Sequence, residues 1–139
     1  MSRLEVLHVE RYQHEATARG HSIVVDEPED VGGQDQGLSP YELLLAALGG
    51  CTAITLRMYA QRKGWSLQDV RVSLSHERSH AEDCEQCDST EGKLDVLRRR
   101  IELVGELDED QREKLREIAA KCPVHRTLHS EVKVRTQLK

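Results

Sequence analysis

The sequence contains no phenylalanine, and only one tryptophan and three tyrosines among its 139 residues. Without large aromatic side chains, the interior must be filled by leucine, valine, isoleucine and alanine. A chain of this length is expected to form a single domain, here residues 1–139. The hydrophobic core of such a domain is large enough to stabilise the fold but has little excess.

An excess of positive charge is also absent, because 20 lysines and arginines face 25 aspartates and glutamates, for a net charge of -5. Proteins that bind nucleic acid in general carry a basic excess, so this balance excludes that class of function. The one basic run, 98–100, is too short to change the conclusion. We therefore expect no nucleic-acid partner.

Neither a leader segment nor a membrane-spanning run is apparent. The first ten residues carry charges where a signal peptide needs an apolar stretch. The longest apolar run, 43–56, is too short to cross a bilayer and indicates a buried helix. We expect a cytoplasmic protein with no membrane partner. Its four cysteines should be reduced there, which favours catalysis or metal binding over a disulfide framework.

A long helix has clear start and stop signals. Ser39 is suited to the N-cap, Pro40 to the first helical position, and Glu42 completes a Ser-x-x-Glu capping box. Gly64 favours a stop just past the helix end. The helix is apolar over most of its circumference, which predicts an interior position between a sheet and a second copy of itself. An obligate homodimer is therefore expected.

Shorter signals predict the other elements. Before the long helix, we expect strands at 3–12 and 21–28 with a turn near 18–20, and a loop at 26–38. After it, we expect a strand at 70–78, a loop at 79–92 and a strand at 93–107 with a bulge near Leu97. A helix at 108–122 with the apolar stripe Leu115, Ile118 and Ala119 should follow, then one or two helical turns at 123–128 and a closing strand at 131–137.

Two cysteines lie in contexts that suit thiol chemistry. Cys51 sits in the middle of the long helix, next to Gly49 and Gly50, where a free cysteine often serves only as a small buried hydrophobe. Cys122 precedes Pro123 at a helix break, and the unpaired N–H groups of a helix N-terminus favour a thiolate. Two such thiols far apart in sequence suit a peroxidatic and a resolving pair, in which a sulfenic acid is trapped as a disulfide.

The motifs "SPYELLLAALGGCTAITL" and, much later, "CPVHRTL" resemble the OsmC/Ohr family of osmotically induced and organic-hydroperoxide-resistance proteins. The resemblance covers nearly the whole chain in length and element order. It implies an α+β fold, with antiparallel sheets packed around a long buried central helix, and an intertwined homodimer with two active sites at the dimer interface. It also implies thiol-dependent reduction of organic hydroperoxides, with Cys51 as the peroxidatic and Cys122 as the resolving cysteine.

Two further residues are assigned by the same resemblance. Family members that reduce hydroperoxides carry a glutamate directly after the proline of the helix start, but Tyr41 stands there in this chain and Glu42 follows one residue later. Glu42 is therefore either a catalytic residue or only part of the capping box. The family also uses an arginine from the N-terminal strands to stabilise the thiolate, and Arg19 is the candidate, with a solvated turn residue as the alternative.

A second cluster of chemistry-bearing residues follows the strand at 70–78. His76, His80, Cys84 and Cys87 have the spacing His-x3-His-x3-Cys-x2-Cys and supply four ligands of the type that zinc prefers. All four lie in one short segment, whereas structural zinc sites usually join two separated segments. A redox dithiol is disfavoured because nearby acidic residues oppose the thiolate. A structural zinc site and a solvated acidic loop both stay open.

The favoured function is a cytoplasmic thiol peroxidase that acts on organic hydroperoxides, needs no cofactor, and is recycled by a dithiol or small thiol. One alternative is a non-enzymatic module on the same dimeric fold that binds a metal or small ligand through the histidine and cysteine segment. Another is a structural domain that accompanies an enzyme, with Cys51 inert.

Overall fold

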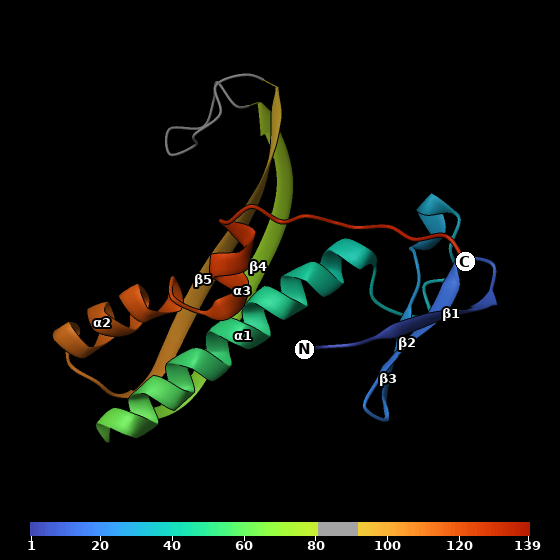
Figure 1. Cartoon of the computed structure of the whole chain (residues 1–139). Helices are drawn as coiled ribbons and strands as arrows, with labels where there is room; N and C mark the ends of the chain where they lie inside the picture. The colour runs from blue at the N-terminus through green and yellow to red at the C-terminus, as the bar shows by residue number, and fades with distance from the viewer. Residues whose placement is uncertain (81–91) are drawn as a thin grey trace. The chain divides into compact units, whose positions relative to one another are not determined.

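The computed structural model describes residues 1–80 and 92–139 (Figure 1). The chain forms two compact units, residues 1–44 and 45–139, and it is α+β, with antiparallel sheets and one long helix. This confirms the expected fold class.

The first unit contains a three-stranded antiparallel sheet in the order β1-β2-β3. Its strands are β1 (Glu5–Glu10), β2 (Gln13–Ala18) and β3 (His21–Val25). Arg19 and Gly20 join β2 to β3, and both have positive φ, 53° and 82°, as a tight type I′ hairpin turn requires. The expected turn near 18–20 is confirmed. Strand β2 was not predicted, because "QHEATA" has too few apolar residues to show an alternating pattern.

The loop predicted at 26–38 is present and contains one short 3-10 helix, η1 (Glu29–Val31). It is organised around the buried carboxylate of Asp26, which is only 1% exposed. This carboxylate accepts hydrogen bonds from the backbone N–H groups of Glu27, at 2.8 Å, and Gln36, at 3.1 Å. The two bonds tie the beginning of the loop to its end.

The long helix α1 spans Pro40–Lys63. Its predicted capping box is confirmed: the Glu42 carboxylate accepts from the Ser39 N–H at 2.9 Å, and the Ser39 hydroxyl accepts from the Glu42 N–H at 3.3 Å. Gly64 follows the helix with φ +71°, the left-handed conformation of a helix stop. By length and apolar composition alone α1 could cross a membrane, but one of its sides packs into the core of the second unit.

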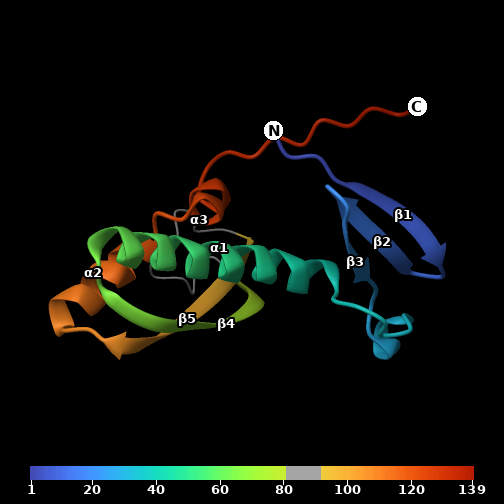
Figure 2. The same ribbon diagram turned by 90° about the horizontal axis from the view of Figure 1, so that it is seen from below.

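The second unit is built on a long antiparallel pair, β4 (Ser66–His80) and β5 (Lys93–Glu106), followed by α2 (Glu109–Ala119) and α3 (Pro123–Leu128). Helices α1 and α2 lie against one face of this pair (Figures 1 and 2). The core consists of aliphatic side chains, as the composition predicts: Leu56, Ala60, Leu115, Ile118 and Ala119. The predicted stripe of the second helix is thus confirmed.

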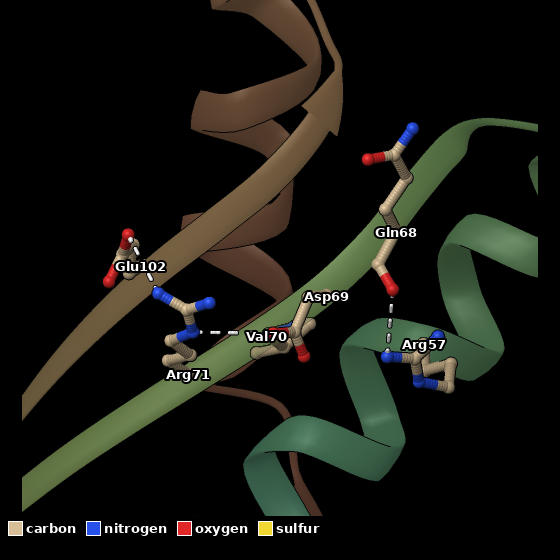
Figure 3. A network of polar contacts seen from close by, with 6 residues as sticks. All are labelled: Arg57, Gln68, Asp69, Val70, Arg71 and Glu102. Carbon is tan, nitrogen blue, oxygen red and sulfur yellow. Dashed lines mark hydrogen bonds and ion pairs between the residues drawn. The ribbon is translucent and has the colours of Figure 1, made fainter.

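The bulge in the β4–β5 pair lies near the start of β4, not near Leu97 in β5 as expected. The pairing register shifts between Leu67 and Asp69, where β4 faces Gly105 and Val104 of β5. The polar contacts around it are drawn in Figure 3: Arg57 of α1 donates to the Gln68 carbonyl at 3.5 Å, and Arg71 lies between Asp69 and Glu102. Gly105 adopts φ +150° at this point. The bulge was misplaced because two neighbouring residues, Val96 and Leu97, are both partly buried and break the alternation, although their pairing with Glu77 and His76 stays in register.

The closing strand expected at 131–137 is also wrong. Val132 and Val134 alternate with polar residues, but both are exposed, and residues 131–139 form no regular element. An alternating segment becomes a strand only where a neighbouring edge takes its backbone hydrogen bonds. No strand of the described chain pairs with this segment.

Candidate active site

Cys122 occupies the N-cap of α3, where the sequence predicts a helix break followed by proline. Its side chain is fully buried, with 0% exposure, and is not in a disulfide. The sulfur accepts a hydrogen bond from the backbone N–H of His125 at 3.3 Å. The thiol therefore caps the short helix while buried beneath it.

The second contact of Cys122 comes from α1. The hydroxyl of Thr52 lies 3.9 Å from the Cys122 sulfur and is itself fully buried. Because this hydroxyl donates its one proton to the Leu48 carbonyl at 2.7 Å, the S–H group of Cys122 is the donor in the contact. Thr52 follows Cys51 directly in the sequence, so the turn of α1 that carries Cys51 packs against Cys122.

Arg99 completes this cluster from β5. Its Nη1 donates to Thr52 Oγ1 at 2.9 Å and to the Ala119 carbonyl at 3.3 Å, and its Nη2 lies 3.2 Å from Nδ1 of His125. The guanidinium thus joins α1, the end of α2 and α3. A cation suits this position because the last carbonyls of a helix carry partial negative charge. We call Thr52, Arg99, Cys122 and His125 the Cys122 cluster.

Sequence analysis missed Arg99, although the alternation of β5 contains a signal. Arg99 is in phase with Leu97 and Ile101, which are partly buried, whereas Arg98 and Arg100 in the other phase are exposed. An arginine that points toward a core is unusual unless it is paired. No signal in the sequence identifies Thr52 or His125, because their contacts depend on how α1 and α3 cross the sheet.

His125 is held neutral in this environment. Partial burial, the charge of Arg99 and the nearby His129 together lower the pKa of His125. Since a guanidinium can only donate, Nδ1 of His125 accepts from Arg99 and the ring proton resides on Nε2. The His125 ring stacks on His129 with centroids 4.5 Å apart.

Cys51 lies on a different face of α1 from Thr52 and is partly buried and reduced. Its face carries an apolar stripe with spacings of four, three and four residues: Ala47, Cys51, Ile54 and Met58. Ile54 and Met58 are 62% and 64% exposed within the chain. Cys51 therefore lies within an apolar surface that the described elements of its own unit leave partly exposed.

The two glycines before Cys51 differ in role. A Cβ on Gly49 would lie 2.6 Å from Cδ1 of Leu74, whereas a Cβ on Gly50 would meet nothing within 4 Å. Leu74 pairs with Arg99 across the β4–β5 ladder. Gly49 thus allows α1 to approach the sheet at the level of the Cys122 cluster.

The other residues assigned by resemblance lie in the first unit. Arg19 is exposed in the β2–β3 turn. The Glu42 carboxylate is bound in the capping box, and the hydrogen bonds from Ser39 lower the pKa of Glu42. The roles of Arg19 and Glu42 stay predictions from the resemblance.

The predicted metal site falls mostly outside the described residues. Cys84 and Cys87 lie in 81–91, and the side chain of His80 is not described. His76 lies in β4, with Nε2 2.8 Å from the Asp95 carboxylate of β5. No group of three or more metal-ligating side chains occurs within 1–80 and 92–139. The zinc site stays a sequence-based prediction.

Comparison with known proteins defines the family. Residues 33–137 match the family model of OsmC-like proteins, so the chain belongs to the OsmC-like protein family. No curated protein matches it in sequence.

Solved structures share the fold at low sequence identity. An OsmC-like protein from Mycoplasma pneumoniae has a TM-score of 0.73 at 19% identity, covering 93% of this chain and 87% of that one. An organic hydroperoxide resistance protein OsmC from Legionella pneumophila has a TM-score of 0.65 at 20% identity, with coverages of 92% and 88%. The organic hydroperoxide resistance protein OhrB of Bacillus subtilis has a TM-score of 0.62 at 17% identity, with coverages of 100% and 98%.

Proposed function

We propose that this protein is a cytoplasmic thiol peroxidase that reduces organic hydroperoxides, with Cys51 as the peroxidatic and Cys122 as the resolving cysteine. Membership of the OsmC-like family supports a peroxidase-like role at the level of the family. Two proteins of the same fold are named organic hydroperoxide resistance proteins, which supports the substrate class.

One contact supports the pairing of the two thiols more than any other. Thr52, the immediate neighbour of Cys51, lies 3.9 Å from the Cys122 sulfur, although 70 residues separate Thr52 and Cys122 in sequence. A resolving cysteine must lie close to the helical turn that carries the peroxidatic one. The packing of α1 on α3 brings the turn that carries Cys51 to Cys122, which supports the proposed pairing.

The proposed reaction has two steps. The sulfur of Cys51, as a thiolate, attacks the terminal oxygen of the hydroperoxide, so an S–O bond forms, the O–O bond breaks, and the alkoxide leaves and takes a proton to become an alcohol. The Cys122 sulfur then attacks the sulfenic acid. An S–S bond forms, the S–O bond breaks, and the hydroxide leaves as water with the proton from Cys122. A dithiol or small thiol reduces the disulfide and restores both cysteines.

The active form is proposed to be a homodimer. The apolar stripe around Cys51 has the alternating spacing of three and four residues that packs two helices side by side. Large exposed apolar surfaces on a small protein mark interaction sites. Packing of this stripe against a second chain would enclose Cys51 in an apolar environment at the interface, where an organic hydroperoxide can bind.

Arg19 is retained as the proposed cation for Cys51. In the first step, a guanidinium beside the sulfur would stabilise the thiolate and polarise the peroxide. This role rests on the family resemblance and on the exposed position of Arg19 in the β2–β3 turn.

A hydroperoxide-consumption assay tests the proposed function. We expect turnover of tert-butyl hydroperoxide in the presence of a dithiol, and its loss in Cys51→Ser. In a parallel reaction without dithiol, Cys122→Ser should still consume about one equivalent per chain, because the first step needs only Cys51. Turnover that survives Cys51→Ser would exclude Cys51 as the reacting group, and wild-type protein without turnover would remove the proposed function.

A further inference from the structure

We infer that Arg99 is a positioning residue for the resolving cysteine, a role distinct from that of the arginine expected at the peroxidatic thiol. The inference rests on the proposed function and concerns only its second step. Arg99 acts on Cys122 through the two groups that contact the sulfur.

Those two groups are both fixed by the same guanidinium. Thr52 Oγ1, which receives the S–H of Cys122, accepts from Nη1 of Arg99 at 2.9 Å. His125, whose backbone N–H donates to the sulfur at 3.3 Å, has its ring Nδ1 3.2 Å from Nη2. The planar guanidinium of Arg99 thus holds both groups that contact the thiol, Thr52 and His125, at the same time. Lysine cannot reproduce this geometry with a single nitrogen.

The charge of Arg99 is not used elsewhere in the described chain. The ion pairs within 1–80 and 92–139 include no carboxylate bound to Arg99. Its partners there are a hydroxyl, a carbonyl and a neutral imidazole. No carboxylate of the described chain therefore competes with Thr52 and His125 for the Arg99 guanidinium, which leaves it free to orient these two groups.

The same contacts exclude His125 as the base for that proton. Nδ1 accepts from Arg99 and Nε2 carries a hydrogen, so the ring has no free lone pair. The proton of Cys122 therefore leaves with the hydroxide of the sulfenic acid, as water. Arg99 keeps His125 neutral and in place but does not take part in the bond changes.

Arg99→Met tests this role, with Arg100→Met as the matched control on the exposed face of the same strand. Each reduced protein is mixed with one equivalent of tert-butyl hydroperoxide and quenched at intervals. Mass spectrometry then measures the dimedone adduct of the Cys51 sulfenic acid and, in parallel samples, the Cys51–Cys122 disulfide. We expect Arg99→Met to form the sulfenic acid at about the wild-type rate but the disulfide about tenfold more slowly, because hydrogen bonds to a charged group are lost.

Two further variants separate positioning from folding. Thr52→Val keeps the branched shape but replaces the hydroxyl by a methyl group, so it should also slow disulfide formation while leaving the sulfenic acid step unchanged. Arg99→Lys should form the disulfide faster than Arg99→Met but more slowly than wild type, because lysine keeps the charge and loses the two-nitrogen geometry. Arg100→Met should match wild type.

The outcomes distinguish this inference from the proposed function. If wild type and Arg99→Met form the disulfide at equal rates, the positioning role is wrong and the peroxidase stands. A proportional loss of both steps in Arg99→Met would show a general structural role and also overturn the inference. If wild type forms no sulfenic acid, the proposed function fails, and the role of Arg99 fails with it.

Discussion

At the scale of single residues, one buried and two partly buried polar side chains form a network around Cys122. Thr52, Arg99 and His125 come from a helix, a strand and a second helix, and each contacts the next. Buried polar groups are costly unless they are bonded, so such a network fixes one arrangement of the elements that contribute to it. Cys122 is held within that arrangement.

The network predicts a pH dependence of stability. Because the pKa of His125 is lowered below its ordinary value of 6.5 in the folded chain, the unfolded chain takes up this proton more readily. The free energy of unfolding should be constant, as far as His125 is concerned, above about pH 7.5, and should fall as the pH drops below 6.5 toward the folded value. Protonation would place a second cation against Arg99.

Urea unfolding at pH 7.5 and 5.5 measures this effect, with His125→Gln as the comparison. Glutamine can still accept from Arg99 but does not titrate, so the variant should lose less stability between the two pH values than wild type. An equal loss in both proteins would show that His125 does not contribute to the pH dependence.

At the scale of elements, the position of α1 on the sheet determines whether the site forms. Local signals predict the helix itself: Ser39, Glu42 and Gly64 act within one or two turns, and all three are confirmed. The close approach at Gly49 depends on Leu74, which lies 25 positions later in the sequence. No local pattern could identify that contact.

Alanine substitutions at the two glycines should separate propensity from packing. Gly49→Ala and Gly50→Ala gain a similar helix propensity, about 1 kcal/mol each. The new methyl group at Gly49 would lie 2.6 Å from Cδ1 at the end of the Leu74 side chain, which must shift, and this costs about 1 kcal/mol, the low end for overpacking of a core.

Gly49→Ala should therefore be less stable than Gly50→Ala by about that amount in chemical denaturation. Equal stabilities would mean that Leu74 moves aside without cost. In that case the glycine would not be needed for the approach of α1 to the sheet.

The other features that the sequence did not predict also depend on contacts between residues far apart in the chain. The thiol at the helix break and the capping box follow from adjacent residues, whereas Arg99 could be placed only by knowing which phase of β5 faces inward. Strand β2 is too polar to show a pattern, and residues 131–137 have the pattern of a strand without a partner edge. Pairing and register are long-range properties, which a single sequence specifies only weakly.

At the scale of the whole molecule, the exposed apolar stripe of α1 favours assembly with a second chain. A chain of 139 residues that leaves Ile54 and Met58 more than half exposed on its longest apolar helix has a surface suited to burial against another chain. A second copy would cover the stripe and Cys51 together.

Charge introduced into this stripe should disrupt the dimer. Sedimentation at micromolar concentration should give about twice the monomer mass for wild type, because two apolar stripes bury each other. Ile54→Lys should shift the protein toward the monomer, since a buried unpaired charge is strongly unfavourable. Gln68→Lys, at the exposed bulge of β4, adds the same charge away from the stripe and should stay dimeric. A wild-type protein that sediments as a folded monomer would contradict the proposed assembly.

The central claim is that Cys51 and Cys122 react with each other after Cys51 meets a hydroperoxide. Peptide mapping tests it most directly: the reduced protein is treated with about one equivalent of tert-butyl hydroperoxide, alkylated, digested without reductant and analysed by mass spectrometry. We predict a peptide pair linked through Cys51 and Cys122, with Cys84 and Cys87 alkylated and outside the link. Both thiols free, or Cys51 linked to any other cysteine, would contradict the account.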